Sequence, residues 1–131
     1  MKILLDINAL IALSHASHVA HARAAAWYRT VRGRDTTLCT CAITELGFVR
    51  VSVQAGLQSD VAAARKALAA LKSTSPVPFE LLGDSLGVDR LPTFAKTPAR
   101  LTDGHLLDLA REHHAQFATL DLEIPGAMLL P

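Results

Sequence analysis

Four acidic side chains, Asp6, Glu45, Asp103 and Asp121, stand where predicted strands end or predicted helices begin. Two carboxylates about 4 Å apart repel by roughly 4 kcal/mol at an effective dielectric near 20, so a group of them needs a compensating cation. Oxygen ligands select a hard ion such as Mg²⁺ or Mn²⁺. Such an ion can orient and acidify a water for attack on a phosphodiester, and we therefore hypothesise phosphodiester hydrolysis.

The alternative is that each acid has only a local structural role. Asp6 or Asn8 would cap the helix that follows the first apolar run, because Asp and Asn are preferred at that position. Asp103 would favour a first helical turn and Asp121 a turn. The sequence leaves this alternative open.

Three histidines spaced by threes, His15, His18 and His21, suggest a zinc site at first sight. No cysteine or acid lies beside them to complete a zinc shell. We therefore interpret them as surface or helix-end side chains.

The hydrophobic pattern predicts strands that alternate with helices. Strands are expected at 3–5, 37–40, 77–82, 116–120 and 127–130, and helices at 9–13, 17–33, 41–53, 59–72 and 102–115. Pro78 predicts an edge position or a late start for the third strand. This order implies an α/β fold with a mostly parallel sheet and helices on both faces. In such a fold the carboxyl ends of the strands share one edge, and all four acids belong to it.

Composition sets broad limits. A chain of 131 residues, half of it hydrophobic, suits one domain spanning 1–131. A net charge of +1 argues against strong bulk attraction to nucleic acid. Cys39 and Cys41, the only cysteines, suit neither a paired-cysteine zinc site nor a disulfide framework, which favours the reducing cytoplasm. Asp6 and Asn8 interrupt the first apolar run, so we expect no export signal and no membrane span. The mean hydropathy of +0.28 favours self-association, and we expect a homodimer.

The segments LLDINALIAL, TELGFVRV, LTDGHLLDLA and ATLD, in this order, resemble PIN-domain ribonucleases, and among them the VapC toxins of bacterial toxin-antitoxin systems. The resemblance spans nearly the whole chain, and the first and third segments are the most specific. It implies a three-layer α/β/α PIN-like fold with an acidic Mg²⁺ or Mn²⁺ site. It also implies cleavage of RNA, inhibition by a cognate VapB-like antitoxin, and contact with DNA only through that antitoxin.

The resemblance also assigns roles to individual residues. Asp6 and Asp103 would bind the metal directly, Glu45 would complete the acidic triad, and Asp121 would be a fourth, more variable acid that often acts through water. Asn8 and Thr102 would orient the acids, and Arg50 would be an auxiliary polar residue. Apart from the resemblance, the nuclease hypothesis makes Lys96, Arg100 and the basic cluster from Arg29 to Arg34 candidate phosphate contacts.

Two other functions remain open at this stage. A PIN-type nuclease could act in RNA maturation or on DNA instead of serving as a toxin. The chain could also be a non-catalytic corepressor that binds a DNA-binding antitoxin, although it has no helix-turn-helix signature or strongly basic face of its own. Activity of the isolated chain separates catalysis from simple binding.

Overall fold

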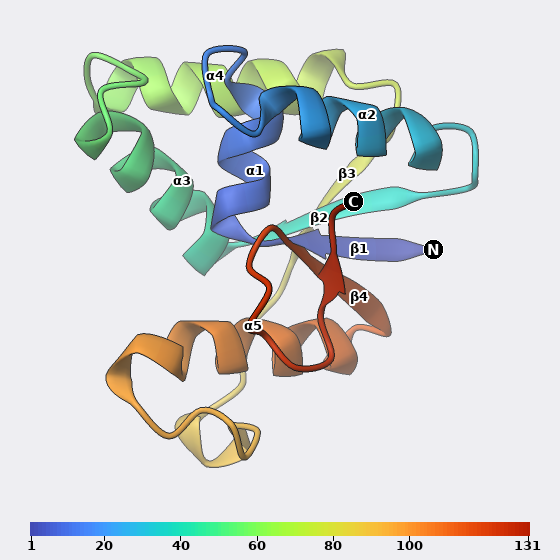
Figure 1. The fold of residues 1–131 in the computed structure, drawn as a ribbon, viewed down its shortest axis with the longest axis vertical. Coiled ribbons are helices and arrows are strands. Elements are labelled where there is room, and N and C mark those ends of the chain that lie inside the picture. Colours follow the sequence, from blue (N-terminus) through green and yellow to red (C-terminus); the bar gives the residue numbers. More distant parts are fainter.

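A five-stranded parallel sheet forms the centre of the computed structural model, which describes residues 1–131 (Figure 1). The strand order is β3-β2-β1-β4-β5. The strands are β1 (Lys2–Leu5), β2 (Thr37–Cys41), β3 (Phe79–Leu82), β4 (Ala115–Thr119) and β5 (Met128–Leu129). The helices are α1 (Ile7–Ser14), α2 (His21–Val31), α3 (Ala42–Gln54), α4 (Val61–Thr74) and α5 (Leu101–Glu112), with short 3₁₀ turns at Val88–Arg90 and Pro98–Arg100.

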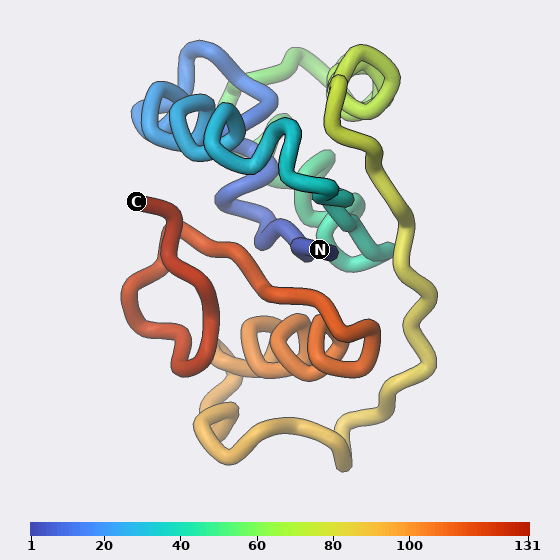
Figure 2. Tube along the Cα trace, turned by 90° about the vertical axis from the view of Figure 1, so that its right-hand side faces the viewer, coloured from blue at the N-terminus to red at the C-terminus, as the bar shows by residue number.

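Helices cover both faces of the sheet, which confirms the predicted three-layer α/β/α class. Helices α1 to α4 lie on one face and α5 lies on the other, as Figures 1 and 2 show from two directions. Each interface has its own hydrophobic core. Leu10, Trp27 and Phe48 belong to the core on the four-helix side, and Leu106 and Phe117 belong to the core under α5. The sheet is therefore buried on both faces, as its apolar strands predict.

The predicted edge position of the third strand is confirmed, since β3 pairs only with β2. The predicted start of the second helix at Ser17 is wrong. Helix α2 begins at His21 after turns, its N-cap residue Ala20 makes no side-chain capping hydrogen bond, and Val19, which the prediction placed inside the helix, is 97% exposed. The His21 imidazole Nδ1 lies 2.8 Å from the carbonyl oxygen of Ala12, and this bond fixes the start of α2 beside α1.

The central pair of strands determines where the acids lie. Strand β1 pairs in parallel with β4, with Leu5 opposite Ala118, and the Asp6 backbone N–H donates to the Ala118 carbonyl at 2.8 Å. The segments that follow β1 and β4 therefore leave the sheet side by side. No helix in this structure combines the length and apolar character that a membrane crossing requires.

Candidate active site

Asp6 is the most buried acid at this edge, with 7% of its surface exposed. It is the N-cap of α1, and its Oδ1 accepts a hydrogen bond from the Ile7 backbone N–H at 2.7 Å. Its Oδ2 accepts a second one from the Thr119 hydroxyl at 2.7 Å. Burial raises the pKa of Asp6, these two hydrogen bonds oppose the rise, and the charges of Asp103 and Asp121 add to it. Asp6 is thus a helix cap and also part of a charged cluster.

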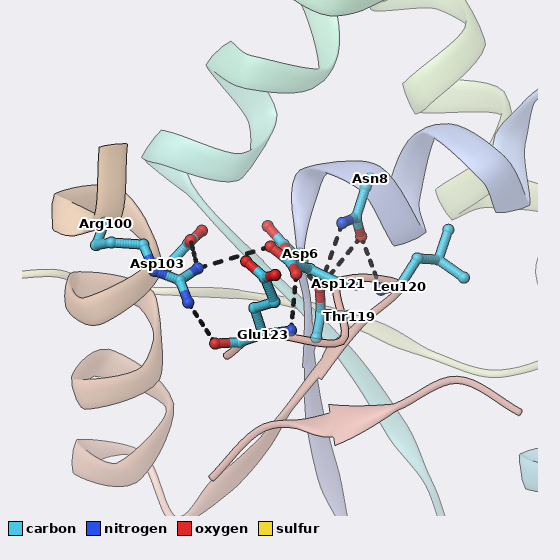
Figure 3. Close-up of polar contacts among 8 residues, drawn as sticks. All are labelled: Asp6, Asn8, Arg100, Asp103, Thr119, Leu120, Asp121 and Glu123. Carbon is cyan, nitrogen blue, oxygen red and sulfur yellow. Dashed lines mark hydrogen bonds and ion pairs between the residues drawn. The ribbon is translucent and has the colours of Figure 1, made fainter. Parts of the chain in front are cut away.

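Asn8 and Thr119 connect the ends of β1 and β4. The Asn8 side-chain carbonyl accepts from the Leu120 backbone N–H at 3.1 Å, and its amide donates to the Thr119 hydroxyl oxygen at 3.3 Å. That oxygen also accepts from the Asp121 backbone N–H at 3.0 Å. Thr119 therefore orients Asp6 and the backbone of Asp121 together, as Figure 3 shows for the side chains. Sequence reasoning missed Thr119, although its place in the segment ATLD before a candidate acid was a usable signal.

Thr102 does not have the orienting contacts that we expected of it. It is exposed in the first turn of α5, and its side chain makes no hydrogen bond to the acids. Thr119 makes those contacts instead, because it ends the strand adjacent to β1.

Asp103 reaches the same edge from the other helical layer, in the first turn of α5. Burial is the main cause that raises the pKa of Asp103; the nearby Arg100 guanidinium lowers it, and the charge of Asp121 raises it further. Arg100 Nη1 lies 3.3 Å from Asp103 Oδ2 and 3.8 Å from Asp121 Oδ2 (Figure 3). Three aspartates from three elements therefore share one electrostatic environment, with a single guanidinium between two of them.

A cavity of about 300 Å³ opens beside these side chains. Its walls are Asp6, Ile7, Asn8, Ile11, His18, Val51, Asp103 and Asp121. His18 was interpreted from the sequence as a surface or helix-end side chain, yet it lines this cavity. Its Nδ1 accepts from the Ala20 backbone N–H at 3.0 Å, so the ring is held by the turn before α2. His15, in contrast, is buried against Phe48 and hydrogen-bonded to Ser52, which is a structural role.

Glu45 is not among the residues that line this cavity. It lies in the first turn of α3, and its carboxylate accepts from the Thr40 hydroxyl at 2.5 Å and is paired with Lys72 of α4. It lines a larger groove of about 900 Å³ between α3 and α4, and Arg50 lines that groove too. Lys96 is exposed, and its side chain makes no hydrogen bond or ion pair. No three His, Cys, Asp or Glu side chains in this structure are arranged to hold a metal ion together.

The donor set at the cavity nevertheless suits a hard divalent ion. Asp6, Asn8, Asp103 and Asp121 offer only carboxylate and amide oxygens, the ligands that Mg²⁺ and Mn²⁺ prefer. Burial is the main cause of the raised pKa values of Asp6 and Asp103, and the neighbouring charge of Asp121 raises both further. The residues present therefore fit a divalent cation at this edge.

This fold and this acidic edge define a class of protein. The sequence profile of the PIN domain matches residues 3–126, and the chain belongs to the PIN domain family. Its relatives include ribonuclease VapC38 of Mycobacterium tuberculosis, which is 38% identical over 90% of this chain and 84% of its own. Ribonuclease VapC29 of the same species is 39% identical over 92% and 86%, and ribonuclease VapC44 is 35% identical over 97% and 94%.

Solved structures show the same fold. The M. tuberculosis toxin VapC20, described as cleaving the sarcin-ricin loop, superposes with a TM-score of 0.62 at 15% identity, covering 92% of this chain and 89% of its own. VapBC2 of Rickettsia felis, bound to a promoter DNA fragment, superposes with a TM-score of 0.64 at 11% identity, covering 98% and 97%. At these identities the likeness concerns the fold alone.

Proposed function

We propose that this protein is a metal-dependent endoribonuclease that acts as the VapC-like toxin of a toxin-antitoxin pair. The observation that carries the proposal is the gathering of Asp6, Asp103 and Asp121 around one cavity in a chain whose relatives are VapC ribonucleases. Family membership supports metal dependence, and the oxygen-only donor set favours Mg²⁺ or Mn²⁺.

Asp6 and Asp103 would hold the ion directly, with Asp121 as an additional acid that acts through water. Bound there, a divalent ion supplies an acidified water and offsets charge on the leaving oxygen of a phosphodiester. The Ile7 N–H and the Thr119 hydroxyl hold both oxygens of Asp6 in place before any ligand arrives. Such preorganisation lowers the reorganisation needed during the reaction.

Glu45 is the third acid of the proposal, on the family resemblance and on its place after β2. In this structure its carboxylate is paired with Lys72, so it would have to leave that lysine to approach an ion at the cavity. Lys96 remains a proposed phosphate contact on an exposed loop, and Arg50 would act from the neighbouring groove.

The test is cleavage of total RNA by the purified chain with Mg²⁺ or Mn²⁺. We expect Asp103→Asn to abolish cleavage and Mn²⁺ binding while the protein stays folded. Asp60→Asn is the matched control, because Asp60 caps α4 on the exposed surface and should tolerate the change. Cleavage that survives in Asp103→Asn would overturn the site. A folded wild type that binds Mn²⁺ yet cleaves no RNA would favour the non-catalytic corepressor.

The groove between α3 and α4 is the surface we propose for a VapB-like antitoxin. Its floor and rim carry apolar side chains, of which Leu46 and Leu81 are 69% and 61% exposed. Arg50 and Arg65 also line it. An amphipathic helix with an apolar face and acidic flanks fits such a groove. We also propose that the protein forms a homodimer through another exposed apolar surface. DNA would be contacted only through the antitoxin.

A further inference from the structure

Arg100 lies where a cation at this site would compete for ligands. Its guanidinium approaches the Oδ2 atoms of both Asp103 and Asp121, at 3.3 and 3.8 Å. Figure 3 shows it pointing from the end of the loop before α5 into the acidic cluster. Its side chain is 25% exposed, so the ion pairs are partly shielded from water.

Contacts outside the acidic cluster also hold this guanidinium in place. Arg100 Nη2 donates to the Glu123 carbonyl, and the guanidinium carbon lies 5.7 Å from the centre of the Phe94 ring. A flat cation over an aromatic face is attracted by the ring, and a fixed backbone carbonyl restricts it further. The position of Arg100 is therefore built by the loop and the β4–β5 connection, and does not depend on the acids alone.

We propose that Arg100 is a resident counter-cation that competes with the divalent ion for Asp103 and Asp121, and so sets the metal concentration at which the site fills. The proposal rests on the metal site of the proposed function. It differs from the phosphate-binding role expected from the sequence, because the arginine acts first on the acids and not on RNA.

The physical reason is that both cations need the same oxygens. A divalent ion bound by Asp103 and Asp121 would need carboxylate oxygens that Arg100 Nη1 approaches at 3.3 and 3.8 Å. Two like charges at that separation repel strongly, so filling the site requires Arg100 to withdraw from Asp103 Oδ2. Because Glu123 and Phe94 hold the guanidinium in its present position, this withdrawal opposes binding of the ion.

The test compares Mn²⁺ affinity by isothermal titration calorimetry in wild type, Arg100→Gln and Arg100→Lys. We expect Arg100→Gln to bind Mn²⁺ about tenfold more tightly, the size expected when one nearby charge is removed from a partly exposed site. Arg100→Lys keeps the positive charge but loses the planar set of guanidinium donors, so its Mn²⁺ affinity should lie between those of the wild type and Arg100→Gln. Arg90→Gln is the matched control, since Arg90 pairs with Asp108 and Glu112 of the same helix α5 outside the cavity.

Thermal denaturation gives a second readout that does not depend on cleavage. In EDTA, Arg100→Gln should melt below the wild type, because its carboxylates are less neutralised, and it should gain more from saturating Mn²⁺. Should Arg100→Gln fail to fold without metal, the same comparison is made with Arg100→Lys.

The outcomes separate the two proposals. In one outcome the wild type binds Mn²⁺ and Asp103→Asn abolishes this binding, but both Arg100 variants bind Mn²⁺ as well as the wild type or more weakly. That outcome would overturn the proposal that Arg100 is a counter-cation and would leave the nuclease proposal intact. Absence of Mn²⁺ binding in the wild type and in every Arg100 variant would overturn both.

Discussion

Replacing Asp6 with Asn measures what burial of this charge costs the fold. Asn is as good an N-cap as Asp and still accepts from the Ile7 N–H, so the start of α1 is kept. The raised pKa of Asp6 means that the folded protein favours a neutral group there. Asn is neutral at every pH, so we expect Asp6→Asn to be more stable than the wild type at pH 7. A higher Tm for Asp6→Asn in EDTA at pH 7 is the readout.

The pH dependence follows from the sign of this shift. Folded Asp6 binds its proton at a higher pH than unfolded Asp6, whose pKa is near 3.8. The wild type therefore has its full disadvantage above the folded pKa of Asp6, and loses it as pH falls through that value toward 3.8. Urea denaturation in EDTA at a series of pH values should show Asp6→Asn ahead at pH 7 and the two proteins converging at acidic pH.

Metal should reverse the order of stability. At a free Mn²⁺ concentration 100 times its Kd, the wild type gains about 2.7 kcal/mol, and a variant that has lost the site gains nothing. Asp60→Asn, which changes an exposed cap, should follow the wild type in every condition. An Asp6→Asn protein that is less stable in EDTA at pH 7, or whose difference from the wild type is the same at pH 7 and at acidic pH, would refute the reasoning.

Two further predictions concern the α3–α4 side of the molecule. Because Lys72 is paired with the Glu45 carboxylate, we expect Lys72→Ala to tighten Mn²⁺ binding a few-fold and Glu45→Gln to weaken it, as measured by calorimetry. An unchanged Mn²⁺ affinity in both variants would remove Glu45 from the set of metal ligands. Leu46 is 69% exposed in the groove, so Leu46→Glu should leave the Tm within about 2 °C of the wild type while weakening antitoxin capture at least tenfold in a pull-down with a co-expressed antitoxin. Intact capture would move the antitoxin to another surface.

The sheet and three of the four acids follow from simple features of the sequence. Apolar runs separated by helical patterns imply parallel strands, and parallel strands bring their carboxyl ends to one edge. Asp6 and Asp121 each lie just beyond a strand of the central pair β1 and β4, so their proximity follows directly from topology. Asp103 needs one more step, because α5 must pack with its first turn toward that edge.

The side-chain partners could not be predicted in the same way. Lys72 lies 27 residues beyond Glu45, and their pairing depends on how α4 packs against α3. Arg100 is three residues from Asp103, but its contact with Asp121 depends on the connection after β4. Such pairings are set by tertiary packing, which the period of the hydrophobic pattern does not encode.

Gly104 shows how sequence reasoning and structure can predict opposite signs. It lies inside α5, where helix propensity alone predicts that Gly104→Ala stabilises by about 1 kcal/mol. In the structure a Cβ at this position would lie 2.7 Å from the Cβ of Ala95 and 3.3 Å from Pro92 Cδ, so the loop that ends in Arg100 must move. We therefore expect Gly104→Ala to destabilise by about 1–3 kcal/mol.

A double-mutant cycle decides between these two signs. Ala95→Gly removes the atom that a Cβ at Gly104 would strike first, so the double variant should recover most of the stability lost in Gly104→Ala, measured by urea denaturation. Displacement of the loop should also loosen the hold of Arg100 on Asp103, and Mn²⁺ affinity in Gly104→Ala should move in the direction of Arg100→Gln. A Gly104→Ala protein that is more stable than the wild type would show that helix propensity outweighs the packing of this loop on α5.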